Sequence, residues 1–185
     1  MSATNRGSIR RESDFYKTPY DAVEKVLDAL GGFYGNEFLE CCAGDGVIVR
    51  ALRRNFEEIN ISAIEIREEE KSRLLYAGAD AVDIADFRQW KPDGKIDVII
   101  TNPPYSIAQE IIEHCFEIAP EAEIIMLLRL AFLESKKRKS FWGKHPVTQI
   151  YVLSERPSFT GKGTDATAYA WFVWSKSREP KIKVI

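Results

Sequence analysis

Residues 96–105 read Ile-Asp-Val-Ile-Ile-Thr-Asn-Pro-Pro-Tyr, a short apolar run followed at once by a stiff polar turn. The apolar run predicts a buried strand over 96–101. The turn at 102–105 would then lie just beyond the carboxyl end of that strand, which is where open α/β sheets bind their ligands. We therefore expect an α/β sheet with a ligand site at this turn.

The turn carries groups suited to holding an amino group. Two prolines fix φ near −65° and leave the backbone carbonyls facing outward. The amide oxygen of Asn102 beside the carbonyl of Pro103 makes a pair of acceptors for an –NH2 group, and Tyr105 offers a flat face for a planar ring. The alternative is that Pro103 and Pro104 only form a turn before a helix that begins near Ser106.

On both sides of the turn, short apolar runs alternate with amphipathic stretches. Strands are expected over 38–42, 61–66, 81–84, 96–101 and 123–128, and helices over 21–30, 47–56, 68–77 and 107–118. This alternation predicts a doubly wound, mostly parallel Rossmann-like α/β sheet. The later segments 148–153 and 168–174 are rich in β-branched and aromatic residues and predict an antiparallel hairpin at the C-terminal end.

The bulk composition is that of one soluble domain. We expect a flexible polar arm over 1–13 and a single domain over 14–185. No apolar stretch approaches the ~20 residues of a membrane span, and no apolar signal-peptide core follows Met1. Three cysteines, of which Cys41 and Cys42 are adjacent, form neither a disulfide framework nor a zinc pattern, so we expect a cytoplasmic protein without a metal.

The formal net charge of −2 argues against a protein that binds nucleic acid through bulk charge. One stretch departs from this balance: between Arg129 and Lys144 there are six basic residues and a single acid, Glu134. This stretch is either a nucleic-acid face or a solvated helix face. Its central cations are Lys136, Lys137, Arg138 and Lys139.

A glycine turn lies between the first expected strand and the following helix, where residues 40–46 read Glu-Cys-Cys-Ala-Gly-Asp-Gly. Two glycines there let backbone amides approach a ligand at a helix N-terminus. Glu65, at the end of the next strand, suits hydrogen bonds to a ribose diol. Val49 stands where a dinucleotide fingerprint has its third glycine, which disfavours NAD or FAD and favours a ligand with one nucleoside. A plain structural turn is the alternative.

Residues 85–87, Ala-Asp-Phe, follow the third expected strand. The Asp86 carboxylate can accept a hydrogen bond from an exocyclic amine, and Phe87 can pack on a ring. Asp86 could equally be a helix N-cap.

Taken in order, the motifs at 40–46, Glu65, 85–87 and 102–105 resemble those of S-adenosylmethionine-dependent amino-methyltransferases of the N6-adenine class. The resemblance covers roughly residues 14–175. Arg-Pro-Ser-Phe at 156–159 and Asp-Ala-Thr-Ala-Tyr-Ala-Trp at 165–171 are similar to the tail of small phage-type DNA adenine methyltransferases. The resemblance implies S-adenosylmethionine as cofactor, and methyl transfer to the N6 amine of an adenine flipped out of DNA in a prokaryotic or phage-infected cell.

The resemblance also implies roles for single residues. The segment before the first helix would close over the cofactor with Tyr16, Thr18 and Pro19. The glycine turn would hold the methionine end with Glu40, Ala43, Gly44 and Gly46. The ribose and adenine would lie against Glu65, Ile66, Asp86, Phe87 and Asn102. Catalysis would fall to Asn102, Pro103, Pro104 and Tyr105. The nucleic acid would contact Tyr105, Phe159, Lys136, Lys137, Arg138 and Lys139.

Other functions fit the same motifs. An RNA N6-adenine methyltransferase needs no base flipping from a duplex, and a protein glutamine N5-methyltransferase binds a planar amide with the same tetrapeptide. An alternative from a different functional class is a non-catalytic protein that keeps the methyltransferase fold and only binds a partner. No separate target-recognition domain fits in the chain, so we expect a short target site or loose recognition. No signal in the sequence selects between a monomer and a weak dimer.

Overall fold

The computed structural model describes residues 17–157 and 166–185. The expected arm over 1–13, together with Tyr16 and Phe159, lies outside the described residues. The strands are β1 (Glu37–Glu40), β2 (Asn60–Glu65), β3 (Ala81–Ile84), β4 (Val98–Thr101), β5 (Glu123–Arg129), β6 (Gln149–Val152), β7 (Tyr169–Trp174) and β8 (Lys181–Val184). The α-helices are α1 (Tyr20–Leu30), α2 (Val47–Asn55), α3 (Lys71–Ala77), α4 (Ala108–Ile118) and α5 (Lys139–Lys144). Short 3-10 turns are η2 (Glu68–Glu70), η3 (Phe87–Gln89), η4 (Leu130–Leu133) and η5 (Lys136–Arg138).

The described strands form one sheet in the order β3-β2-β1-β4-β5-β7-β6-β8. Strands β1 to β5 run parallel, while β7 is antiparallel to both β5 and β6. The predicted fold class, a mostly parallel Rossmann-like sheet with an antiparallel C-terminal part, is confirmed. The strand order reverses between β1 and β4, and such a switch point opens a crevice at the carboxyl ends of the strands.

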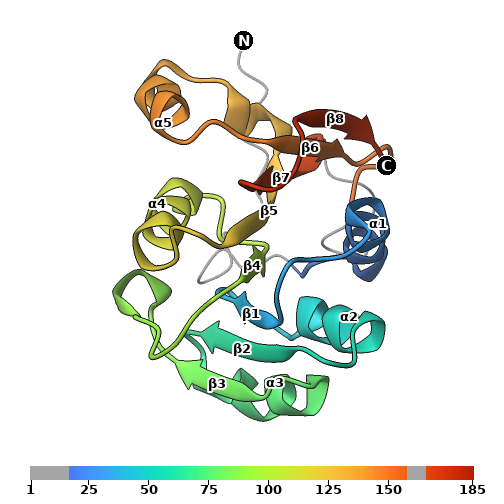
Figure 1. Ribbon diagram of the computed structural model, residues 1–185, viewed down its shortest axis with the longest axis vertical. Helices are drawn as coiled ribbons and strands as arrows, with labels where there is room; N and C mark the ends of the chain where they lie inside the picture. Colours follow the sequence, from blue (N-terminus) through green and yellow to red (C-terminus); the bar gives the residue numbers. More distant parts are fainter. Residues whose placement is uncertain (1–16, 158–165) are drawn as a thin grey trace.

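Two apolar cores cover the two faces of the sheet. Helices α1, α2 and α3 pack on one face through residues such as Val23, Leu52 and Leu74, and α4 and α5 pack on the other through Ile112 and Phe141. Figure 1 shows this division, with α1 and α2 on one side of the strands and α4 and α5 on the opposite side. Both faces of the central strands are therefore buried, which explains why β4 reads as a continuous apolar run.

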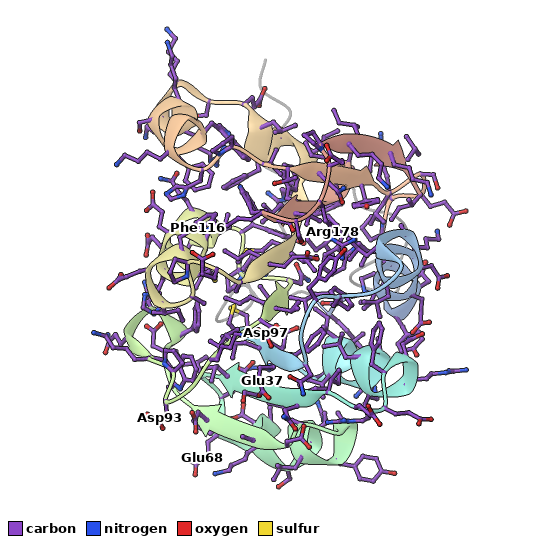
Figure 2. All side chains as sticks on the ribbon, in the orientation of Figure 1. Glu37, Glu68, Asp93, Asp97, Phe116 and Arg178 are labelled. Carbon is purple, nitrogen blue, oxygen red and sulfur yellow. The ribbon has the colours of Figure 1, made fainter. Side chains whose placement is uncertain are left out.

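Charged side chains connect the amino ends of the central parallel strands, at the edge of the sheet opposite to their carboxyl ends. The Asp97 carboxylate, just before β4, accepts the backbone N–H groups of Asn36 (3.1 Å) and Glu37 (3.2 Å) at the start of β1. Arg178, labelled in Figure 2, forms an ion pair of 2.9 Å with Glu123 and donates to the carbonyl of Leu30 (2.8 Å) at the end of α1. These contacts hold the amino ends of β1, β4 and β5 in register.

The structure differs from the predictions at several boundaries and in two elements. The expected helix over 68–77 is a 3-10 turn followed by α3, and β1 ends at Glu40, so that Cys41 and Cys42 belong to the turn. Helix α5 and strand β8 were not predicted. Strand β8 is an exposed edge that pairs only with β6 among the described strands, and its Lys-Ile-Lys-Val sequence carries no core pattern. No described helix combines the length and the apolar composition that crossing a bilayer requires.

Candidate active site

A pocket of about 480 Å³ lies at the carboxyl ends of β1, β2, β3 and β4, at the switch point of the sheet. Its size and its mixture of apolar walls with a few polar groups are those of a small-molecule site. The turns after these strands supply most of the wall: 40–45, 64–67, 85–88 and 102–104, with Thr18, Ile48, Ser106, Ile107 and Ile111. The structure thus brings the four sequence motifs together around one cavity.

The glycine turn and the acid of the next strand are directly joined. The backbone N–H of Gly44 donates to Glu65 Oε2 at 2.7 Å, in a buried contact. Gly44 has φ of 56°, in the left-handed region that favours glycine. The second carboxylate oxygen, Oε1, accepts the backbone N–H of Arg67 (3.0 Å) and its Nε (2.9 Å). Glu65 is therefore held rigidly at the wall of the pocket.

Gly46 does not line the pocket, although the sequence placed it at the cofactor. Its φ of 76° makes it the left-handed N-cap of α2. A Cβ at this position would lie 2.9 Å from the Cβ of Ala77 and 3.2 Å from a methyl carbon of Leu74. Gly46 is needed because α2 begins against α3 with no space for a side chain.

Glu40 is a buried acid at the floor of the pocket, with 1% of its surface exposed. Its Oε1 accepts the backbone N–H of Cys42 at 3.2 Å, while Oε2 is buried without a hydrogen-bond partner among the described residues. Burial raises the pKa of Glu40 to about 8, against the opposing effect of the nearby Thr101 side chain and the Cys42 N–H. A buried carboxyl oxygen without a partner can receive a donor or a cation from a ligand.

Asp86, in the motif at 85–87, accepts more hydrogen bonds than the sequence suggested. Asp86 accepts from the Arg88 guanidinium, with 2.6 Å from Nη2 to Oδ2 and 3.0 Å from Nε to Oδ1, and it also caps η3 by accepting the Arg88 N–H. These hydrogen bonds lower the pKa of Asp86 below its usual range. Arg88 also reaches Glu110 at 3.3 Å. Asp86 is thus both the N-cap of η3 and a residue of the pocket wall, so a capping role and a ligand-binding role are compatible.

The apolar residues of this end differ in exposure. Ile66 is 58% exposed at the pocket wall, which is unusual for isoleucine and leaves an apolar surface for a ring to cover. Phe87 is almost fully buried and packs against the rings of Trp90 and His114. Phe87 therefore supports the wall from behind more than it presents a free ring face.

The Asn102 carboxamide, just after β4, is bonded at both ends. Its Nδ2 donates to Thr18 Oγ1 at 3.0 Å, and its Oδ1 accepts the hydroxyl of Tyr105 at 3.0 Å. Pro103 and Pro104 also line the pocket. The sequence placed Thr18 at the cofactor but contained no sign of its bond to Asn102.

Besides Gly46, two more residues predicted for the site, Tyr105 and Pro19, do not line this pocket. The hydroxyl of Tyr105 reaches Asn102, its ring lies 5.6 Å from that of Tyr169, and the guanidinium of Arg129 is 5.1 Å from its centroid. Pro19, the residue before α1, lines a separate small cavity with Leu153 and Pro157. The tertiary packing of α1 against the sheet carries Pro19 away from the glycine turn.

The basic stretch separates into two kinds of cation. Lys136, Lys137 and Lys139 are exposed, and no carboxylate of residues 17–157 or 166–185 lies within 4.0 Å of them. Arg138 instead donates to the carbonyl of Glu134 at 2.9 Å, and its guanidinium lies 4.4 Å from the centroid of the Phe132 ring. Arg138 therefore stabilises the local fold of this stretch, while its predicted contact with nucleic acid stays a prediction, as it does for the lysines.

Sequence reasoning missed three charged residues near the pocket. Arg67 and Arg88 hold the predicted acids, and Lys17 forms an ion pair of 3.1 Å with Asp45 of the glycine turn. Arg67 and Arg88 each stand two residues after the acid that they bind, and that spacing was the available signal. The contact of Lys17 had none, because it depends on how the N-terminal segment crosses the sheet.

Compared with models of known protein families, the sequence matches none. It is 23% identical over 201 aligned positions to the type II methyltransferase M.CvrRI of Paramecium bursaria Chlorella virus XZ-6E. The alignment covers 86% of this chain and 53% of the relative, so the chain spans about half the length of that protein.

Solved structures of several methyltransferases share the fold of this chain. A candidate RNA methyltransferase from Pyrococcus horikoshii has a TM-score of 0.70 at 18% identity, with 90% of this chain and 88% of that chain covered. The tRNA (uracil-54, C5)-methyltransferase of Pyrococcus abyssi, solved with S-adenosyl-L-homocysteine, has a TM-score of 0.61 at 17% identity, with 86% of this chain and 39% of that chain covered. Similarity of sequence to one methyltransferase and of fold to others supports the placing of this chain in the S-adenosylmethionine-dependent methyltransferase family, as its motifs predicted.

Proposed function

We propose that this protein transfers a methyl group from S-adenosylmethionine to the N6 amine of adenine in DNA. The observation that carries the proposal is the Asn102 carboxamide, which lines a pocket together with Pro103 and with the acids Glu40, Glu65 and Asp86. One side of the pocket thus has acceptors for an amine, and the other has acids suited to a nucleoside with a cationic tail.

The residues present fit S-adenosylmethionine. The unpartnered Glu40 Oε2 suits the cationic methionine end, and Glu65 suits the ribose hydroxyls. Asp86 lines the pocket beside its contacts to Arg88 and would accept the adenine amine there, and the exposed Ile66 can cover one face of the ring. When bound, the cofactor supplies an electrophilic methyl group: the N6–carbon bond forms, the sulfur–carbon bond breaks, and N6 loses one proton to water.

The chain's own groups act on the target amine. An adenine N6 lone pair is delocalised into the ring, which makes the nitrogen a poor nucleophile. Acceptors at Asn102 Oδ1 and at the Pro103 carbonyl favour a more tetrahedral nitrogen and stabilise the positive charge that develops on it. The stiff Pro103-Pro104 backbone keeps these acceptors in place, so that the geometry is prepared before the substrate arrives.

The exposed lysines Lys136, Lys137 and Lys139 supply a surface for a nucleic-acid backbone. Strands β4 and β5 are adjacent and parallel, so the turn after β4 and the segment after β5 leave the same edge of the sheet. Arg129, the last residue of β5, lies over the ring of Tyr105 in the turn after β4, so the lysine segment starts beside this turn. A polyanion bound at the lysines would therefore lie on the edge of the sheet that carries Asn102.

The second candidate is methylation of adenine N6 in RNA. Two of the proteins of similar fold are named as RNA methyltransferases, whereas the viral relative is named as a type II methyltransferase. We favour DNA because the tail at 156–159 and 165–171 resembles the small phage-type DNA enzymes.

The test is transfer of radiolabelled methyl from S-adenosylmethionine to unmethylated duplex DNA, single-stranded DNA, bulk RNA and protein. We expect label in DNA, recovered as N6-methyladenine, and its loss in Asn102→Ala with cofactor binding retained. Label only in RNA or only in protein would overturn the DNA assignment while leaving the chemistry. Cofactor binding without transfer to any acceptor would overturn the enzyme assignment and favour a binding module.

A further inference from the structure

We propose that Thr18 is a positioning residue for methyl transfer, because together with the Tyr105 hydroxyl it sets the rotation of the Asn102 carboxamide. This inference rests on the proposed function, in which Asn102 Oδ1 accepts the target amine. It assigns to Thr18 a role toward the acceptor side of the site, whereas its sequence motif pointed to the cofactor.

A carboxamide has two ends of nearly equal shape and opposite hydrogen-bonding character. If Asn102 rotated by half a turn, an –NH2 group would face the target amine, and two donors would meet. In the structure Thr18 Oγ1 accepts from Nδ2 and the Tyr105 hydroxyl donates to Oδ1, each at 3.0 Å. Both hydroxyls can donate or accept, so the two contacts hold the plane and the position of the carboxamide, and the phenol, as the more acidic hydroxyl, favours Oδ1 on the Tyr105 side.

Thr18 is itself held from both sides. The preceding residue, Lys17, is paired with Asp45 at 3.1 Å, and the following residue, Pro19, has φ fixed at −66°. Helix α1, which starts at Tyr20, is anchored to β7 by a bond of 2.9 Å from Trp171 Nε1 to the Ala22 carbonyl. The hydroxyl of Thr18 therefore meets Asn102 from a rigid support, as a positioning group must.

Tyr105 is supported in the same way on the opposite side. Its ring is tilted by 45° against Tyr169, and the Arg129 guanidinium lies over it. Tyr169 in turn accepts a hydrogen bond of 3.3 Å from Arg129 Nε. The two contacts that hold Asn102, from Thr18 and from Tyr105, thus join the segment before α1 to the ends of β4, β5 and β7. Local sequence does not predict them.

The test compares Thr18→Val, which keeps the side-chain shape without the hydroxyl, with Thr18→Ser, which keeps the hydroxyl. We expect Thr18→Val to lower kcat by about 10-fold to 100-fold, since small displacements of reacting groups have effects of this size. We expect Thr18→Ser to keep near-normal kcat, and both variants to bind S-adenosylhomocysteine as wild type does. Tyr105→Phe, which keeps the ring, should lower kcat in the same direction.

A second measurement does not depend on activity. The side-chain NH2 signals of Asn102 in a 15N–1H spectrum, assigned by their disappearance in Asn102→Asp, should shift and become more mobile in Thr18→Val but not in Thr18→Ser. Unchanged Asn102 signals in a folded Thr18→Val variant would overturn the inference. Wild-type kcat in that variant, or a fall in S-adenosylhomocysteine affinity that matches the fall in rate, would also overturn it. A wild-type protein inactive on every acceptor overturns the proposed function instead, and the spectrum still decides whether Thr18 orients Asn102.

Discussion

The carboxylate of Glu65 accepts the backbone N–H of Gly44 at 2.7 Å, and this contact joins the turn after β1 to the end of β2. The two motifs belong to neighbouring parallel strands, so their carboxyl ends lie side by side. Because Arg67 holds the other oxygen of Glu65, the acid that we assign to the ribose is in place before a ligand binds. Such preorganisation lowers the cost of ordering the site on binding.

Replacement of Glu65 by Gln tests this assignment. We expect S-adenosylhomocysteine to bind about 10-fold to 100-fold more weakly, because a hydrogen bond to a charged group contributes roughly 1.5–3 kcal/mol. Isothermal titration calorimetry measures the change. The matched control is Glu68→Gln, an exposed acid in η2, which should bind as wild type does. Equal affinities for wild type and Glu65→Gln would contradict the ribose assignment.

Glu40 should make stability depend on pH in the direction opposite to an acid whose pKa is lowered by a partner, such as Asp86. Burial raises its pKa from 4.5 to about 8, so between these values the folded chain keeps a proton that the unfolded chain releases. The contribution of Glu40 to the free energy of unfolding is therefore fully present below its unfolded pKa of 4.5, and it is lost as the pH rises through about 8. We expect Glu40→Gln, which never ionises, to gain in Tm over wild type as the pH rises from about 5 to about 8.5. A Tm difference that stays constant with pH would contradict the raised pKa.

The same group should couple cofactor binding to proton release. A cationic ligand end beside Glu40 Oε2 favours the carboxylate, so binding to wild type near neutral pH should release a proton. Calorimetry of S-adenosylmethionine binding in buffers of different ionisation enthalpy measures this release, which Glu40→Gln should abolish. Proton release of equal size in the variant would show that another group is responsible.

The lysine surface should control nucleic-acid binding through salt. We expect the triple change Lys136→Gln, Lys137→Gln and Lys139→Gln to weaken binding and to reduce the slope of log K against log[salt] by up to about 3. Fluorescence anisotropy over a salt series measures the slope. Lys183→Gln, on the exposed β8 edge, is the matched control and should leave it unchanged. A triple variant with the wild-type slope would exclude this surface as the binding face.

Two glycines offer a matched pair for stability. Gly35 has φ of 108°, and a Cβ there would lie 2.3 Å from Cγ of Asp97, the acid that holds the start of β1. We expect Gly35→Ala to lower the free energy of unfolding by about 2 kcal/mol or more, through backbone strain and this clash. Gly94 has open space around its Cβ position, so Gly94→Ala should change stability by less than about 0.5 kcal/mol. Urea unfolding decides, and equal stabilities would contradict the clash.

Much of the fold followed from local patterns. The run over 96–101 predicted a buried central strand because both faces of β4 are covered, and the amphipathic spacing over 21–30 predicted α1 almost to the residue. Helix α5 and strand β8 were missed for a physical reason. Six residues are too few to show a helical period, and an exposed edge strand has no apolar face to reveal it.

The site was predictable to a similar degree. Glu40, Glu65, Asp86 and Asn102 each stand at the last residue of a strand or within two residues after it, and parallel strands bring their carboxyl ends to one edge. The displacement of Gly46 and Pro19 from the pocket was not predictable, since it depends on how α2 meets α3 and how α1 meets the sheet.

The amino-acid sequence by itself determined the order of strands and helices, the mostly parallel sheet and the residues that gather at its switch point, because these follow from hydrophobic periods and from turns of a few residues. The tertiary structure alone decided which partners each polar group has. Thr18 and Asn102 are 84 residues apart in the sequence, yet their side chains are bonded at 3.0 Å. A hydrogen bond requires a distance and an angle between two atoms, and for residues so distant in the chain only the packing of the whole sheet and its helices sets both.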